Sequence, residues 1–223
     1  MALILNIETS TTNCSVSLSH DAETVVLVED NSLGYSHAEL LHVFIKKLFE
    51  KTGYKLNDID AVAVSKGPGS YTGLRIGVST AKGLCFALDK PLIALDTLEI
   101  LAHQIEVERG YVVPMLDARR MEVYSAIFNS RFEWVRGVAS EILHADSFIE
   151  QLQEDSVHFI GNGVEKTKAI IKHKNAVFIE DKLPSAKEMG HLAEAKYKIS
   201  DTEDVAYFEP YYLKDFIALK KKS

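Results

Sequence analysis

The sequence has few of the residues that mark secreted, metal-binding or membrane proteins. Its two cysteines, Cys14 and Cys85, stand in no CxxC or metal-ligand spacing, which suits a reducing compartment. The eight histidines are scattered, and His37 and His42 would diverge by about 140° on a helix, too far to grip one metal ion. The N-terminus lacks the basic region of a signal peptide, and no apolar run is long enough to span a bilayer. We therefore expect a cytoplasmic protein that holds no metal and contacts no membrane.

Positive charge is also scarce. The 223 residues include 25 Lys and Arg against 32 Asp and Glu, which gives a net charge of −7. Because phosphate contact requires clustered Lys and Arg, this balance argues against tight nucleic-acid binding by the chain alone. The length and the 47% share of hydrophobic residues are sufficient for one large domain or two small ones.

The most informative segment is the glycine-rich stretch at residues 65–77. It follows an apolar run at residues 59–64, which predicts a buried strand, and it opens a predicted helix that ends near residue 88. Four small residues recur at every fourth position of this helix: Gly73, Gly77, Ala81 and Cys85. This spacing places them in one row. Since glycine inside a helix costs about 1 kcal/mol relative to alanine, the row predicts close approach of another helix or of a ligand.

The same stretch matches neither of two catalytic loops that it superficially suggests. No Gly-Lys-Ser/Thr follows at the spacing of a nucleotide-binding P-loop. Pro68 occupies the first glycine position of a GxSxG nucleophile elbow around Ser70, and no positioned base is evident. The segment is therefore not predicted to carry a nucleophile.

The order of predicted elements indicates the fold. Three strands, then alternating helices and strands, lead to a helix that begins at Thr97, which is the order of a ribonuclease-H-like core. After residue 110 a hairpin begins a shorter second unit, in which we place a last helix over residues 186–199. We predict an α/β protein with two domains of the actin/hexokinase (ASKHA) type, the second one reduced. The expected domains are residues 1–108 and 109–205, with a C-terminal segment, 206–223, packing back on the first.

A turn rich in hydroxyl groups follows the first predicted strand. It resembles the first phosphate loop of the actin/hexokinase superfamily, and it consists of Glu8, Thr9, Ser10, Thr11 and Thr12. In such loops glycine lets the backbone approach phosphate, but here Ser10 stands in the glycine position. No glycine pair follows Asp117, where a second phosphate loop would lie. We expect a degenerate loop and no cofactor, and a plain hairpin turn is the alternative.

The predicted helix over residues 36–52 carries a second signal. It opens with a capping box formed by Ser36 and Glu39, and its apolar residues cover about 180° of the helix surface. One sheet needs an apolar stripe of only about 100°. The rest of the chain or a partner helix must cover the remaining apolar surface of this helix. Together with the small-residue row, the candidate partner interface comprises His37, Leu40, Leu41, Phe44, Leu48, Tyr71, Gly73, Leu74, Arg75, Gly77, Val78 and Ala81.

Several of these segments together resemble the TsaB (YeaZ) family over essentially the whole chain. The matching segments are residues 7–10, 36–37, 67–77, 91–92, 114–119 and 210–214, with Lys214 where the family has Arg. The resemblance implies a bacterial cytosolic partner of TsaD, the subunit that transfers threonylcarbamoyl to an adenosine beside the tRNA anticodon. It also implies that TsaE, an ATPase, joins the complex, and that the first two helices pair with those of TsaD.

The resemblance further implies a protein that is not itself an enzyme. Thr97 and Leu101 stand where TsaD carries two metal-binding histidines, and neither can replace an imidazole ligand. The resemblance thus implies a scaffold and activator that forms a heterodimer with TsaD and a homodimer when alone. It would contact tRNA only through the complex. A small-molecule kinase of the same fold would need ATP in the interdomain cleft, which the missing glycines argue against. A peptidase would need metal ligands or a nucleophile motif, and the sequence has neither.

Overall fold

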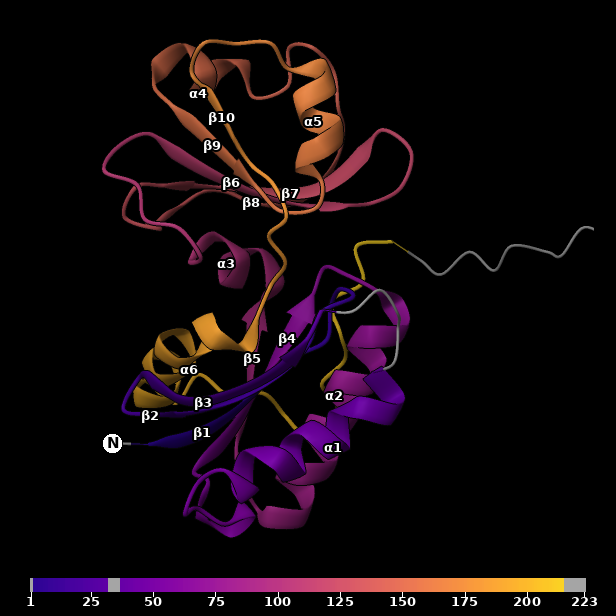
Figure 1. Ribbon diagram of the computed structural model, residues 1–223, viewed down its shortest axis with the longest axis vertical. Helices are drawn as coiled ribbons and strands as arrows, with labels where there is room; N and C mark the ends of the chain where they lie inside the picture. The colour runs from indigo at the N-terminus through magenta and orange to yellow at the C-terminus, as the bar shows by residue number, and fades with distance from the viewer. Residues whose placement is uncertain (1, 32–36, 215–223) are drawn as a thin grey trace, which may run out of the picture.

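Two five-stranded sheets, each with helices packed on it, make up the computed structural model, which describes residues 2–31 and 37–214 (Figure 1). The strand order is β3-β2-β1-β4-β5 in the first sheet and β10-β9-β6-β7-β8 in the second. This confirms the predicted α/β fold of two ribonuclease-H-like units of the ASKHA type, the second one smaller. The predicted capping residue Ser36 and the end of the C-terminal segment, residues 215–223, lie outside the described residues.

The first sheet combines an antiparallel meander with two parallel strands. Its strands are β1 (Leu3–Glu8), β2 (Cys14–His20), β3 (Glu23–Asp30), β4 (Ala61–Gly67) and β5 (Leu92–Asp96). β1 pairs antiparallel with β2 and parallel with β4, so the meander and the parallel pair meet at β1. β1 is buried along its whole length, as expected for a central strand covered on both faces.

Helices cover the two faces of this sheet. α1 (His37–Glu50) and α2 (Tyr71–Leu88) pack on the face that carries Leu3, Leu5 and Ile7. The 3₁₀ turn Ala186–Glu188 and α6 (Met189–Lys198) pack on the opposite face. Successive side chains of a strand point to opposite faces, so β1 supplies both cores.

The position of α6 corrects the expectation that it closes the second unit. Ala186, Met189 and Ala193 join Ile4 and other residues of the first sheet in one apolar cluster. Polar contacts fix the same segment. The Ala186 N–H donates to Ser15 Oγ (2.9 Å), and Ser17 Oγ donates to Ala186 O (2.7 Å). The chain thus returns from the second unit to complete the first one.

The second sheet repeats this topology with shorter parallel strands and shorter helices. Its strands are β6 (Tyr111–Asp117), β7 (Glu122–Asn129), β8 (Trp134–Ile142), β9 (Val157–Ile160) and β10 (Ala176–Ile179). α4 (Ile149–Glu154) and α5 (Val164–Ile170) lie on one face, and α3 (Thr97–Ala102) packs on the other (Figure 1). Because α3 also follows directly on β5, it links the two sheets.

The last described residues run back across the first unit as an extended segment, residues 203–214, called here the C-terminal strap. The Glu203 N–H donates to Leu92 O (2.8 Å), and Lys82 Nζ donates to the carbonyl of Phe208 (2.8 Å). Lys214 then pairs with Glu122 of the second sheet. The strap therefore contacts both units. Within residues 2–31 and 37–214, no helix combines the length and apolar character needed to cross a membrane.

Candidate functional site

The turn between β1 and β2 lies beneath the start of α2. Its residues are buried or half-buried: Glu8, Thr9, Ser10, Thr11 and Thr12. Thr9 Oγ1 donates a hydrogen bond to Gly73 O (2.8 Å), and the Ser70 N–H donates to Ser10 O (2.6 Å). The first turn of α2 is therefore packed directly against this turn.

The glycines of α2 explain how the helix comes so close. A Cβ atom at Gly73 would lie 2.1 Å from Thr9 O, and one at Gly77 would lie 2.2 Å from Thr9 Oγ1. Ala81, further along the same row, is completely buried. The sequence predicted close approach of another helix or of a ligand at this row, and the structure shows close approach of the chain's own turn instead. The row faces the chain's own β1–β2 turn and sheet.

Glu8 is the one acidic side chain in this buried turn. The Ser10 N–H donates to Glu8 Oε1 (2.6 Å), so a backbone amide of the loop is already occupied. Complete burial raises the pKa of Glu8 from 4.5 to about 7, although the hydrogen bonds from Ser10 act in the opposite direction. A filled turn with its own buried carboxyl is a poor receptor for phosphate oxygens.

His37 belongs to the same buried region. Its side chain is 1% exposed, and Nε2 lies 2.7 Å from Thr11 O, so the neutral ring with a proton on Nε2 donates to that carbonyl. Burial lowers the pKa of His37, because the charged imidazolium is poorly solvated there. His37 therefore holds the β1–β2 turn against α1, a role within the chain.

The structure separates the predicted partner-interface residues into two groups. Nine of them are buried within the chain: His37, Leu41, Phe44, Leu48, Gly73, Leu74, Gly77, Val78 and Ala81. Leu40 and Tyr71 are half-buried, and Arg75 is exposed. The wide apolar arc of α1 is thus largely covered by the first sheet and by α2.

A different set of residues lies on the outside of the helix pair. A shallow groove of about 330 Å³ is lined by His42 of α1 and by Ser79, Thr80, Gly83 and Leu84 of α2. Near it on the two helices, Val43 is 44% exposed and Phe86 is 85% exposed. We call these seven residues the outer helix face. A second run of small residues, Ser79, Thr80 and Gly83, was the sequence signal for this face.

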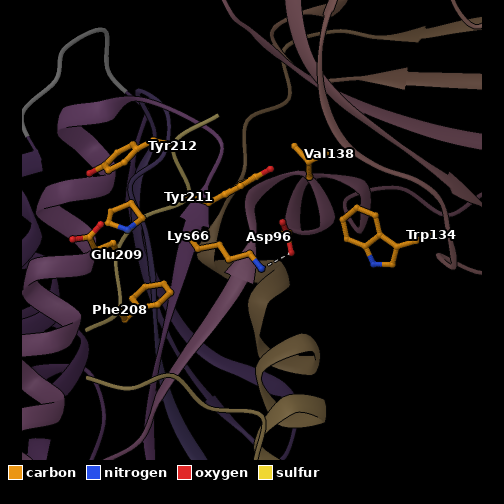
Figure 2. Close-up of a pocket in the computed structure, with 9 residues that line it drawn as sticks. Lys66, Asp96, Trp134, Val138, Phe208, Glu209, Tyr211 and Tyr212 are labelled. Atoms are coloured by element: carbon orange, nitrogen blue, oxygen red, sulfur yellow. Dashed lines mark ion pairs between the residues drawn. The ribbon is translucent and has the colours of Figure 1, made fainter. Parts of the chain in front are cut away.

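A larger cavity of about 690 Å³ lies between the two sheets (Figure 2). It is lined by Lys66 and Asp96, at the ends of β4 and β5, by Trp134 and Val138 of β8, and by residues 208–212 of the C-terminal strap. Lys66 Nζ and Asp96 Oδ2 form an ion pair of 2.9 Å. Sequence reasoning named an interdomain cleft but did not identify its lining residues, because they come from four segments that are distant along the chain.

Helix α3 holds the two positions compared with metal-binding histidines, Thr97 at its start and Leu101 near its end. Thr97 and Leu101 are both completely buried. Leu101 packs in the apolar cluster between α3 and the second sheet. Nowhere in the described chain do three or more His, Cys, Asp or Glu side chains converge as a metal site would require.

Comparisons with known proteins give concordant results. The family model for TsaD, tRNA N6-adenosine threonylcarbamoyltransferase, matches residues 33–222. The tRNA threonylcarbamoyladenosine biosynthesis protein TsaB of Haemophilus influenzae is 31% identical, with 98% of this chain and 96% of the relative covered. The Escherichia coli TsaB is 30% identical, with 98% and 97% covered. A solved structure of YeaZ from Pseudomonas aeruginosa superposes with a TM-score of 0.82 at 27% identity, covering 96% of this chain and all of that one.

Proposed function

Because the chain belongs to the TsaB (YeaZ) family of tRNA threonylcarbamoyladenosine biosynthesis proteins, we propose that it is the non-catalytic partner of a TsaD-type threonylcarbamoyltransferase. In this role it binds TsaD as a heterodimer and activates it, and TsaE joins the larger complex. It forms a homodimer when alone and meets tRNA only through the complex. The N-terminal unit supplies the contact surface.

The buried phosphate turn supports the absence of catalysis by this chain. The first turn of α2 fills the space beside Thr9 and Ser10, and the carboxyl of Glu8 already accepts a loop amide. The kinase alternative requires bound phosphate at this position. Leucine at position 101 and the burial of Thr97 leave no ligand pair for a catalytic metal on α3.

The observation that supports partner binding is the outer helix face. Phe86 is 85% exposed on α2, with exposed Val43 on the neighbouring α1 and a groove between the helices. A large aromatic side chain left in water beside a groove is typical of a protein contact surface. A groove between two helices that is lined by small residues of α2 fits a helix of the partner.

The test uses Val43→Asp and Phe86→Ser with the cognate TsaD. Each variant should weaken the heterodimer at least ~10-fold in calorimetry and should shift the isolated chain to a monomer in size-exclusion chromatography. Circular dichroism should remain unchanged, since both side chains are exposed. Phe44, which is 5% exposed, is unsuitable because a charge there would disrupt the core.

The matched control is Ile199→Asp, which places the same charge at a side chain that is 75% exposed beyond the end of α6. This control should bind TsaD normally. A folded Val43→Asp chain with unaltered affinity for TsaD would refute the outer helix face as the contact surface.

A further inference from the structure

The cavity between the sheets lies where open α/β sheets commonly hold ligands. Lys66 and Asp96 stand at the carboxyl ends of the parallel strands β4 and β5, and β8 of the second sheet forms the opposite wall (Figure 2). Ligands of such sheets bind outside the carboxyl ends of the strands. At about 690 Å³ the cavity falls within the range of small-molecule sites.

The floor of the cavity is shaped by an irregularity in β4. The register of the β4–β5 pair shifts between Ser65 and Gly67, so Lys66 has no partner residue on β5. Bulges of this kind re-aim side chains. Lys66 Nζ reaches Asp96 Oδ2 at 2.9 Å, and the two side chains stay 27% and 19% exposed. A strong donor and a strong acceptor therefore stand side by side and open to the cavity.

This pair complements the edge of a nucleobase. Lysine donates only, and carboxylate accepts only. Nucleobase edges present an acceptor next to a donor, such as N1 beside the N6 amino group of adenine. Asp96 can accept from the amino group while Lys66 donates to the ring nitrogen.

The walls of the cavity supply flat aromatic surfaces. Trp134 comes from the second sheet and is 42% exposed, and Tyr211 comes from the strap and is 45% exposed. Figure 2 shows these two rings on either side of the Lys66–Asp96 pair. Exposed aromatic faces stack on bases, and a two-ring purine offers the larger contact.

The charges that line the cavity disfavour phosphate. Lys66 is the one basic residue of the lining, whereas Asp96 and Glu209 are both acidic. With Lys66 engaged by Asp96, no lining cation is left to compensate a phosphate group. The lining therefore selects against a nucleotide and permits a neutral nucleoside.

We propose that the cleft between the two sheets binds a purine nucleoside by stacking on Trp134 and Tyr211 and by base-edge hydrogen bonds to Lys66 and Asp96. This site goes beyond the proposed function and does not depend on it, because the isolated chain contains every residue involved.

Trp134 makes the test direct, because it is the single tryptophan of the 223 residues. Titration of the isolated chain with adenosine should quench tryptophan fluorescence saturably. AMP should bind more weakly, and ATP most weakly. Absence of saturable quenching by adenosine would overturn the proposal, as would tighter binding with each added phosphate. Tighter binding of tetramethylammonium than of adenosine would also overturn it, since the aromatic rings would then form a cage for cations.

Substitutions of residues that line the cavity test where adenosine binds. Tyr211→Ala and Lys66→Met should each weaken adenosine binding by about tenfold. The strap is held by the backbone of Tyr211, whose N–H donates to Lys66 O (2.7 Å), so both truncations keep it in place. Tyr207→Ala is the matched control, since Tyr207 is 84% exposed on the same strap and outside the cavity lining. Unchanged affinity in both folded test variants would refute the assignment.

Discussion

The two sheets have the same strand order, but the turn after the first strand is buried in one unit and exposed in the other. The β1–β2 turn is buried beneath α2, with Thr9 completely enclosed. The β6–β7 turn faces solvent, and it carries Arg119 and Arg120 in left-handed conformations with φ of 68° and 51°. The difference lies in the helix after the fourth strand. α2 packs its glycines Gly73 and Gly77 directly on the β1–β2 turn, whereas α5 contacts the β6–β7 turn through the ion pair of Lys166 and Asp117.

One backbone feature is common to both units. Gly67, the last residue of β4, has φ of +116°, and Gly161, directly after β9, has φ of +118°. A Cβ at Gly67 would lie 2.7 Å from Tyr211 O, and one at Gly161 would lie 2.2 Å from Met115 O. Both units therefore require glycine where the chain leaves its fourth strand. The two units therefore share this requirement as well as their strand order, and they differ at the turn after the first strand.

The buried turn can be tested by restoring a side chain where α2 approaches it. Gly73→Leu should destabilise the protein by on the order of 4 kcal/mol, because the new Cβ would lie 2.1 Å from a backbone oxygen. Urea unfolding measures the effect. Gly83→Ala on the same helix is the control. It meets no atom within 4 Å and should stabilise by up to ~1 kcal/mol. Equal effects of the two substitutions would contradict close packing at the turn.

Glu8 should make the stability of the buried turn depend on pH. Its pKa in the folded protein is about 7 against an ordinary 4.5, so its contribution is complete below pH 4.5 and falls as the pH rises to 7. Glu8→Gln removes this loss and keeps an acceptor for the Ser10 N–H. At about 1.4 kcal/mol per pH unit, the variant should gain about 3 kcal/mol over the unaltered chain above pH 7.

The measurement is the difference between the two unfolding free energies across this pH range. Burial also raises the pKa of Glu188 to about 7, and taking the difference removes its contribution. A difference that stays constant from pH 4 to 8 would show that folding does not raise the pKa of Glu8.

The exposed turn of the second sheet should respond weakly and in the opposite direction. Arg119→Gly and Arg120→Gly should each stabilise by up to about 1 kcal/mol, because glycine adopts positive φ without the penalty of a Cβ. Thermal unfolding by calorimetry would detect the gain. Destabilisation by both changes would mean that the arginine side chains make stabilising contacts, and the contrast between the turns would be smaller than described.

The sequence was sufficient to predict most of the first sheet and the repeat of its pattern. β1 and β4 each begin with an apolar run, and α1 and α2 have clear helical periodicity. Periodicity gives the spacing of small residues along a helix, but it does not show which part of the protein they contact. For this reason the row that contains Gly73 and Gly77 was assigned to the interface with a partner helix. The wide apolar arc of α1 was misleading for the same reason.

Contacts between distant segments account for the remaining differences. The apolar positions of α6 predict a helix, but they fit either sheet equally well, and the choice depends on partners such as Ile4. β10 has only four residues and exists through its pairing with β9. The cleft requires Lys66, Trp134 and the strap to meet, and no local pattern encodes such a meeting.

The return of α6 to the first sheet has a consequence for synthesis on the ribosome. At about 5–20 residues per second, translation of the second unit leaves one face of the first sheet uncovered for roughly 5–15 seconds. That face carries Ser15 and Ser17, whose final partners are the N–H and carbonyl of Ala186. Until Ala186 emerges, water can bond these hydroxyls. The uncovered face of the nascent sheet is therefore partly polar, which limits its association with other incompletely folded chains.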